Sequence, residues 1–123
     1  MDFVKKLDEL REDLSFENLF SILSSHGDKT AAEYQEDGQI KKLSYADYER
    51  ISMAGAAKLC ELLGDVEKNT FVGLRFANHP LWPAAFWAII LAGYRPLLID
   101  AGSDDNNIMH ILKQAGSRTI YEE

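Results

Sequence analysis

Three residues that could bind a phosphate or a nucleotide stand together after an apolar run. Asp100, Gly102 and Ser103 follow residues 96–99, which have the unbroken apolar character of a buried strand. Open parallel sheets bind ligands at the carboxyl ends of their strands. There an aspartate can accept a phosphoryl group, and a glycine beside a serine lets the backbone approach a nucleotide. The simpler explanation is structural: a turn that leads into an N-cap, with the Asp100 carboxylate bonding within its own loop.

Asn78 and His79 form a second candidate group, after the apolar segment 70–76. Asn78 precedes an expected helix and is more simply an N-cap or turn residue than a ligand contact. The histidines at positions 26, 79 and 110 stand far apart and lack metal-ligand spacing. The glycine-rich phosphate loops GxGxxG and GxxxxGK and the serine elbow GxSxG are all absent. We therefore expect no catalytic residue and no metal site in this chain.

Composition sets broad limits on the function. The chain has 123 residues, of which 46% are hydrophobic and 11% aromatic, enough to build the core of one ordinary domain and to exclude disorder. Lys plus Arg number 13 and Asp plus Glu number 20, so the formal net charge is −7. Such a charge repels phosphate backbones. We expect no nucleic-acid partner.

Cysteine content and hydropathy indicate the compartment. The single cysteine, Cys60, cannot form an internal disulfide, and its place in an apolar helical pattern predicts a small buried side chain. Residues 1–6 contain no signal-peptide run. The longest uncharged apolar stretch, residues 81–94, is shorter than the ~20 residues of a membrane span. We expect a cytoplasmic protein without a membrane span.

Residues 1–28 are predicted to form an N-terminal helical segment. Apolar residues recur at helical spacing on both sides of Ser15, which offers an N-cap to the second helix. Beyond this segment the apolar period changes to two around Asp37-Gly38, a dipeptide typical of tight hairpin turns. The sequence therefore predicts two helices and then a β-hairpin.

Residues 29–123 are predicted to form an α/β subdomain. After the hairpin, Ser44 and Asp47 give a capping box for a long helix. Strand, helix, strand, helix and strand then alternate with short connections, which predicts an open, mostly parallel sheet with helices on both faces. The expected strands are residues 70–76, 96–100 and 118–121, and the expected helices are residues 44–64, 81–92 and 104–115. Leu62 and Met109 are among the side chains expected to be buried.

The helix expected at residues 81–92 is apolar on every side. Trp82, Trp87 and their neighbours point in all directions around it, which predicts a helix buried nearly all round and starting between Pro80 and Pro83. A lone domain of this size rarely encloses a helix so fully. We expect its outer side to be covered by further protein or by self-association through the exposed apolar surface.

Several short motifs follow one another along the chain. They are Leu43-Ser44-Tyr45-Ala46-Asp47-Tyr48, Leu62-Leu63-Gly64, Val72-Gly73-Leu74, Asn78-His79-Pro80, Ala92-Gly93, and Asp100 followed by Ile111-Leu112-Lys113-Gln114-Ala115-Gly116. In this order they resemble the N-terminal part of AMP-forming acyl-CoA synthetases and their relatives, the adenylate-forming superfamily. The resemblance runs from about residue 16 to residue 121. It departs at residues 98–101, Leu-Ile-Asp-Ala, where the family usually has Pro-Leu-Asp-Pro.

The resemblance implies a parent ligase that activates a carboxylate with ATP and magnesium to an acyl-adenylate. The acyl group would then pass to a thiol such as CoA. The family's Ser/Thr/Gly-rich loop ending in Lys-Gly, its ribose-binding aspartate and its C-terminal lysine are absent here. We therefore expect a fragment of a larger doubly wound domain: a scaffold that is not catalytic alone, binds no cofactor itself, and has the remainder of the adenylating domain as its partner.

A rival interpretation comes from a different class of protein. The chain could be a stand-alone, non-catalytic α/β module that docks a partner through its aromatic helix. The length of the natural open reading frame separates the two, because the ligase requires a few hundred further residues that include the Lys-Gly loop.

Overall fold

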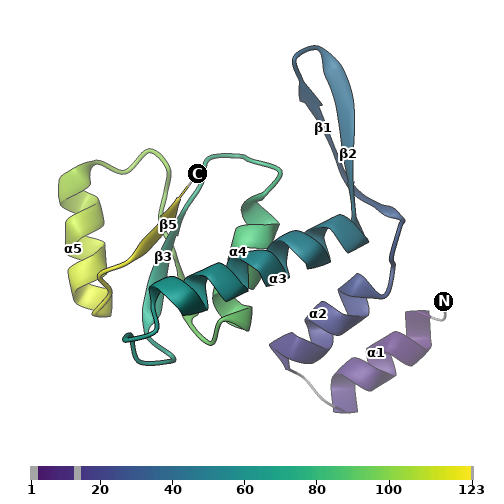
Figure 1. Ribbon diagram of the computed structural model, residues 1–123, viewed down its shortest axis with the longest axis horizontal. Coiled ribbons are helices and arrows are strands. Elements are labelled where there is room, and N and C mark those ends of the chain that lie inside the picture. The colour runs from purple at the N-terminus through teal and green to yellow at the C-terminus, as the bar shows by residue number, and fades with distance from the viewer. Residues whose placement is uncertain (1–2, 13–14, 123) are drawn as a thin grey trace. The chain divides into compact units, whose positions relative to one another are not determined.

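The computed structural model describes residues 3–12 and 15–122 (Figure 1). The chain forms two compact units, residues 1–49 and residues 50–123. Helix α3 (Tyr45–Leu62) begins in the first unit and continues into the second. Among the described residues, no helix is both long and apolar enough to cross a membrane.

The first unit contains two short helices and a hairpin. Helix α1 (Phe3–Glu12) precedes α2 (Phe16–Ser24), and the Ser15 side chain accepts a hydrogen bond from the Asn18 N–H at 3.0 Å, which confirms Ser15 as an N-cap. Strands β1 (Thr30–Glu36) and β2 (Gln39–Ser44) then pair antiparallel.

The hairpin turn has the conformation that its sequence predicts. Asp37 has a φ of 53° and Gly38 a φ of 75°. Positive φ at both central residues defines the tight turn whose twist matches that of the flanking strands. At the end of β2, the Asp47 N–H donates to Ser44 Oγ at 3.0 Å and the Ser44 N–H donates to Asp47 Oδ2 at 2.9 Å. This reciprocal capping box starts α3.

Helix α3 buries a narrower stripe than the sequence predicted. Its buried residues are Ser52, Ala56 and Leu59. The prediction for Cys60 is wrong, because it follows Leu59 and so points about 100° away from the stripe, where it is exposed. The prediction for Leu62 is also wrong: this side chain is 65% exposed and lines a hollow beside the last strand instead of packing into the core.

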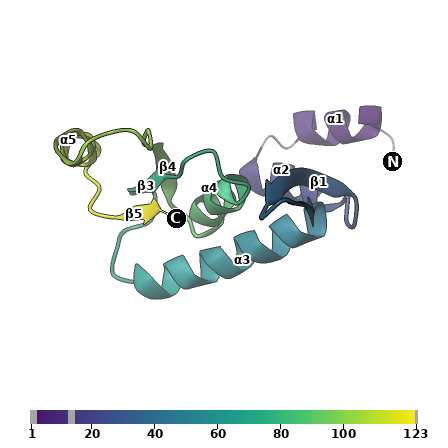
Figure 2. The same ribbon diagram turned by 90° about the horizontal axis from the view of Figure 1, so that it is seen from above.

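The second unit is α/β, as predicted. Its strands form one parallel sheet in the order β4-β3-β5, and a helix follows each of the first two strands in the chain. Its elements in chain order, after α3, are β3 (Phe71–Arg75), α4 (Trp82–Leu91), β4 (Arg95–Leu98), α5 (Asp105–Ala115) and β5 (Ile120–Glu122). Figures 1 and 2 show α4 and α5 on opposite sides of the strands. Because the chain reverses direction across the sheet after β4, right-handed connections require this arrangement.

Each face of the sheet has its own core. On one face, Val72 and Leu74 are fully buried against α3 and α4. On the other face, Ile99 packs with Ile108 and Leu112 of α5. Gly73 lies between Val72 and Leu74, and therefore faces α5.

Helix α4 starts between Pro80 and Pro83, as predicted, and Gly93 follows its C-cap with a φ of 93°. Its fully buried residues are Ala84, Ala85, Ala88 and Ile89. Trp82 and Trp87 are only half-buried. One face of α4 is thus buried completely, rather than the whole circumference.

Helix α5 is capped by Asp104 and by Gly116, whose φ is 69°, which confirms the predicted C-cap. Met109 was predicted to be buried but is 68% exposed. Because Met109 follows the buried Ile108, its side chain points about 100° away from the one sheet face that α5 covers.

The outer edge of β4 contains a proline. Arg95 donates its N–H to Thr70 O and Ile99 donates its N–H to Leu74 O, so alternate residues of β4 face β3. The nitrogen of Pro96 therefore points to the unpaired edge, where a missing N–H disturbs no ladder bond.

Candidate site at the carboxyl edge of the sheet

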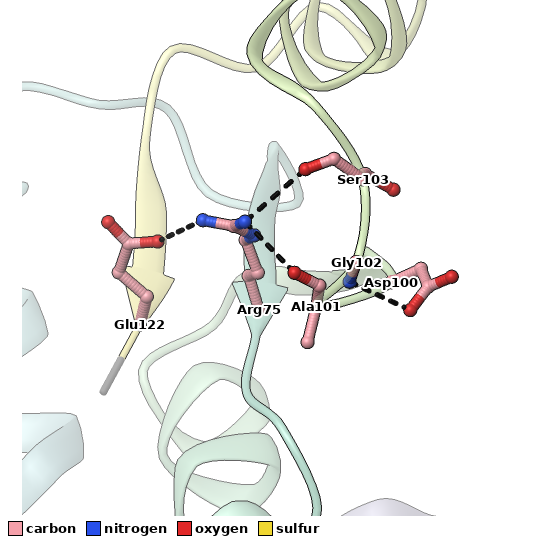
Figure 3. A network of polar contacts seen from close by, with 6 residues as sticks. All are labelled: Arg75, Asp100, Ala101, Gly102, Ser103 and Glu122. Atoms are coloured by element: carbon pink, nitrogen blue, oxygen red, sulfur yellow. Dashed lines mark hydrogen bonds and ion pairs between the residues drawn. The ribbon is translucent and has the colours of Figure 1, made fainter.

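An arginine occupies the carboxyl edge of the sheet (Figure 3). Arg75, the last residue of the central strand β3, donates from Nη2 to Ala101 O at 3.0 Å and to Ser103 O at 3.3 Å. Its Nη1 donates to Glu122 Oε2 of β5 at 3.3 Å. Arg75 Nε is buried and has no hydrogen-bond partner among the described residues. The guanidinium therefore links the ends of two strands to the turn between β4 and α5.

The structure brings Asp100, Gly102 and Ser103 together in that turn. The Ser103 N–H donates to Asp100 O at 3.0 Å, and the Gly102 N–H donates to Asp100 Oδ1 at 3.1 Å. Asp104 then caps α5 by accepting from the Asn107 N–H at 2.8 Å. These polar groups bond within the turn, as the structural explanation of Asp100 predicted.

The segment after β3 holds Asn78 and His79. His79 Nδ1 accepts from the Leu81 N–H at 3.0 Å, so this nitrogen carries no proton in this geometry. His79 O accepts from the Trp82 N–H at 3.0 Å. His79 thus supports the first turn of α4, and the N-cap alternative for Asn78 is wrong, because Leu81 occupies that position.

Aromatic side chains surround this segment. The Phe76 ring centroid lies 5.9 Å from His79 and 5.8 Å from Tyr121. A hollow of about 390 Å³ opens beside Phe76, His79 and Trp82. Apolar rings and one histidine can contact a flat apolar group, but they provide no phosphate cradle.

Arg75 is the residue that the sequence analysis missed. A charged side chain that ends an otherwise apolar strand was the available signal, because burying such a group requires hydrogen-bond partners. Its partners lie at residues 101, 103 and 122, too far along the chain for local patterns to identify.

Two other features bear on the chemistry. Among the described residues, no group of three His, Cys, Asp or Glu side chains could hold a metal ion. In the first unit, burial raises the pKa of the Tyr48 hydroxyl, and Tyr34 raises it further. Neither feature adds a reactive group to the edge.

Comparison with known proteins identifies the family. A profile of the family described as AMP-binding enzyme matches residues 20–123. The chain belongs to the AMP-binding enzyme family. No curated protein matches the chain significantly.

Several solved structures share the fold of this AMP-binding family member. The N-terminal subdomain of Klebsiella oxytoca NpsA, in complex with 3-hydroxyanthranilyl-AMSN, superposes with a TM-score of 0.75 at 19% identity over 88% of this chain and 26% of that chain. The nonribosomal peptide synthetase FmoA3, in its α-methyl-L-serine-AMP bound form, gives 0.71 at 24% identity over 85% of this chain and 11% of that one.

This member of the AMP-binding family spans about a quarter or less of those structures. The part that it contains has the fold of the N-terminal portion of an adenylate-forming enzyme. Family membership therefore favours the ligase interpretation over the stand-alone interaction module.

Proposed function

We propose that this chain is the N-terminal scaffold subdomain of a cytoplasmic, ATP-dependent ligase that activates carboxylates. The parent enzyme would form an acyl-adenylate and transfer the acyl group to CoA or another thiol, as acyl-CoA synthetases do. This chain would not catalyse alone. The family match over residues 20–123 is the observation that carries the proposal.

The carboxyl edge fits a scaffold better than a nucleotide site. Gly102 already donates its N–H to Asp100, and Arg75 is engaged by Glu122 and by two backbone carbonyls. The described residues also gather no metal-binding cluster. ATP, magnesium and a thiol are implied for the parent enzyme. The remainder of the adenylating domain, which is the proposed partner, would bind them.

The proposed partner would also cover α4. Trp82 and Trp87 are half-buried, and Trp82 stacks on Phe86 with centroids 5.4 Å apart. In the isolated chain this apolar surface would instead favour self-association, which sedimentation measures. Strictly monomeric chains whose tryptophans are both inaccessible to a quencher would contradict this part of the proposal.

One experiment compares the 123-residue chain with the natural polypeptide that contains its sequence in the cell. An antibody against residues 1–123 isolates that polypeptide, mass spectrometry measures its length, and both proteins are assayed for carboxylate-dependent ATP–pyrophosphate exchange. We expect a several-fold longer polypeptide with exchange activity, and neither exchange nor micromolar ATP binding for the 123-residue chain. Micromolar ATP affinity of the short chain, or a natural polypeptide no longer than the chain itself, would overturn the proposal.

A further inference from the structure

A groove on the second unit lies away from the carboxyl edge. It has a volume of about 660 Å³ and runs along the last turns of α5 and the start of the connection to β5, which meets the sheet at its amino edge. Met109, His110, Leu112, Lys113 and Arg118 line it, together with Gly116 and Ser117. We call this surface the basic groove.

The charge of the basic groove is opposite to that of the chain. No Asp or Glu lines it, although the chain carries a net charge of −7. Lys113 and Arg118 are exposed, and neither forms an ion pair with a described residue. By contrast, Lys41 and Lys42 of the hairpin pair with glutamates at 3.6 Å. The positive charge of Lys113 interacts favourably with the partial negative charge at the carboxyl end of α5. That interaction does not explain why Arg118 is also present.

The basic groove also has an apolar floor and an apolar rim. Leu112 is buried beneath it, and Met109 is 68% exposed beside it. Gly116 leaves the backbone open, since a Cβ there would have no atom within 4 Å. A flexible thioether on an exposed surface adapts to the side chains of a protein ligand.

We propose that the basic groove docks an acidic amphipathic segment of a partner protein. Carboxylates of the segment would pair with Lys113 and Arg118, and an apolar side chain would cover Met109 and Leu112. Nucleic acids and anionic membranes fit less well, because such extended polyanions reach beyond the groove, where the chain's net charge of −7 repels them, whereas a short segment contacts the groove alone. A small anion would leave Met109 uncovered. This surface is separate from the proposed ligase scaffold, and its test does not depend on ATP chemistry.

The test uses the full chain and a short synthetic helical peptide of Glu and Leu, with Leu on one face. Amide chemical shifts in NMR spectra should change at residues 109–118, with affinity decreasing as salt is raised. Lys113→Glu/Arg118→Glu should weaken binding at least about tenfold, because two attractive pairs become repulsive. Lys29→Glu/Lys58→Glu, which changes the net charge equally, should leave binding within about twofold. Met109→Ala should weaken binding a few-fold, whereas Met53→Ala on α3 should not.

Several results would overturn the docking proposal. These are shift changes confined to other residues, equal binding of a Lys/Leu peptide, equal losses in the two charge-reversal variants, or displacement of the peptide by pyrophosphate or by phosphatidylserine vesicles. Lys113→Gln/Arg118→Gln repeats the test without introducing repulsion. An amide spectrum like that of the wild type establishes that a variant folds.

Discussion

The two faces of the sheet in the second unit differ in the side chains that lie closest to a glycine. On the α3 and α4 face, small residues set the spacing between helices: Gly55 of α3 lies against Ala88 of α4. On the α5 face, the branched side chains of Ile99 and Leu112 fill the space above Gly73. A backbone held at close range cannot adjust to an added atom, whereas the end of a branched side chain can rotate. The two faces should therefore respond differently to the same added methyl group.

Gly55→Ala should cause the largest loss of stability. Its Cβ would lie 2.9 Å from the Ala88 Cβ, so α3 and α4 must separate. The clash exceeds the gain in helix propensity and leaves a net loss of about 2 kcal/mol in the free energy of unfolding. Urea unfolding followed by circular dichroism measures this loss. Gly64→Ala is the matched control, because its Cβ would be 3.6 Å from Cys60 O, an ordinary contact. Equal stability of the two variants would show that α3 and α4 do not approach so closely.

Gly93→Ala should come next, with a loss of about 1 kcal/mol or somewhat more, because a φ of 93° disfavours any side chain. A Cβ there would also lie 3.0 Å from Lys68 Cδ. Comparing the substitution in wild-type and Lys68→Ala backgrounds separates the two causes. A loss that disappears in the Lys68→Ala background would mean that the contact, not the backbone conformation, is responsible.

Gly73→Ala tests the α5 face. Its Cβ would meet Ile99 Cδ1 at 2.9 Å and Leu112 Cδ2 at 3.3 Å, both at the ends of side chains. We expect a loss of about 1 kcal/mol, of which Ile99→Val restores part by removing the nearest methyl group. If the double variant is no more stable than Gly73→Ala in thermal and urea unfolding, the two faces do not differ as argued.

Ser52→Ala should have the smallest effect and the opposite sign. Ser52 is fully buried on α3, and its hydroxyl has no hydrogen-bond partner among the described residues. Removing an unsatisfied hydroxyl from a helix should raise stability by about 0.5–1 kcal/mol. Ser52→Val adds bulk at the same site and serves as the comparison. Destabilisation by Ser52→Ala in urea unfolding would indicate that the hydroxyl makes a hydrogen bond.

Local signals in the sequence predicted those features that neighbouring residues determine. The hairpin turn at Asp37-Gly38, the capping box at Ser44 and the start of α4 depend on contacts within a few residues. The alternation of strands and helices likewise predicted the parallel sheet. Each of these predictions is confirmed.

The incorrect predictions of burial arose because the sequence does not show how much of a helix surface the neighbouring elements cover. Cys60 and Met109 each follow a buried residue, and periodicity alone does not say how wide a stripe the neighbouring elements cover. At the carboxyl edge, the sequence identified Asp100, Gly102 and Ser103 but missed Arg75, because its hydrogen bonds span 26 to 47 residues of sequence. Contacts at such separations follow from topology rather than from local pattern.

Pro96 makes the two edges of the sheet unequal in their ability to pair with a further strand. With its nitrogen at the outer edge, β4 presents one N–H fewer to any incoming strand, whereas β5 contains no proline. Edge-to-edge aggregation through β4 is therefore disfavoured, and a further strand would pair more readily with β5. Since β5 is the last of the three strands to be synthesised, the edge that can accept another strand is also the last to emerge from the ribosome.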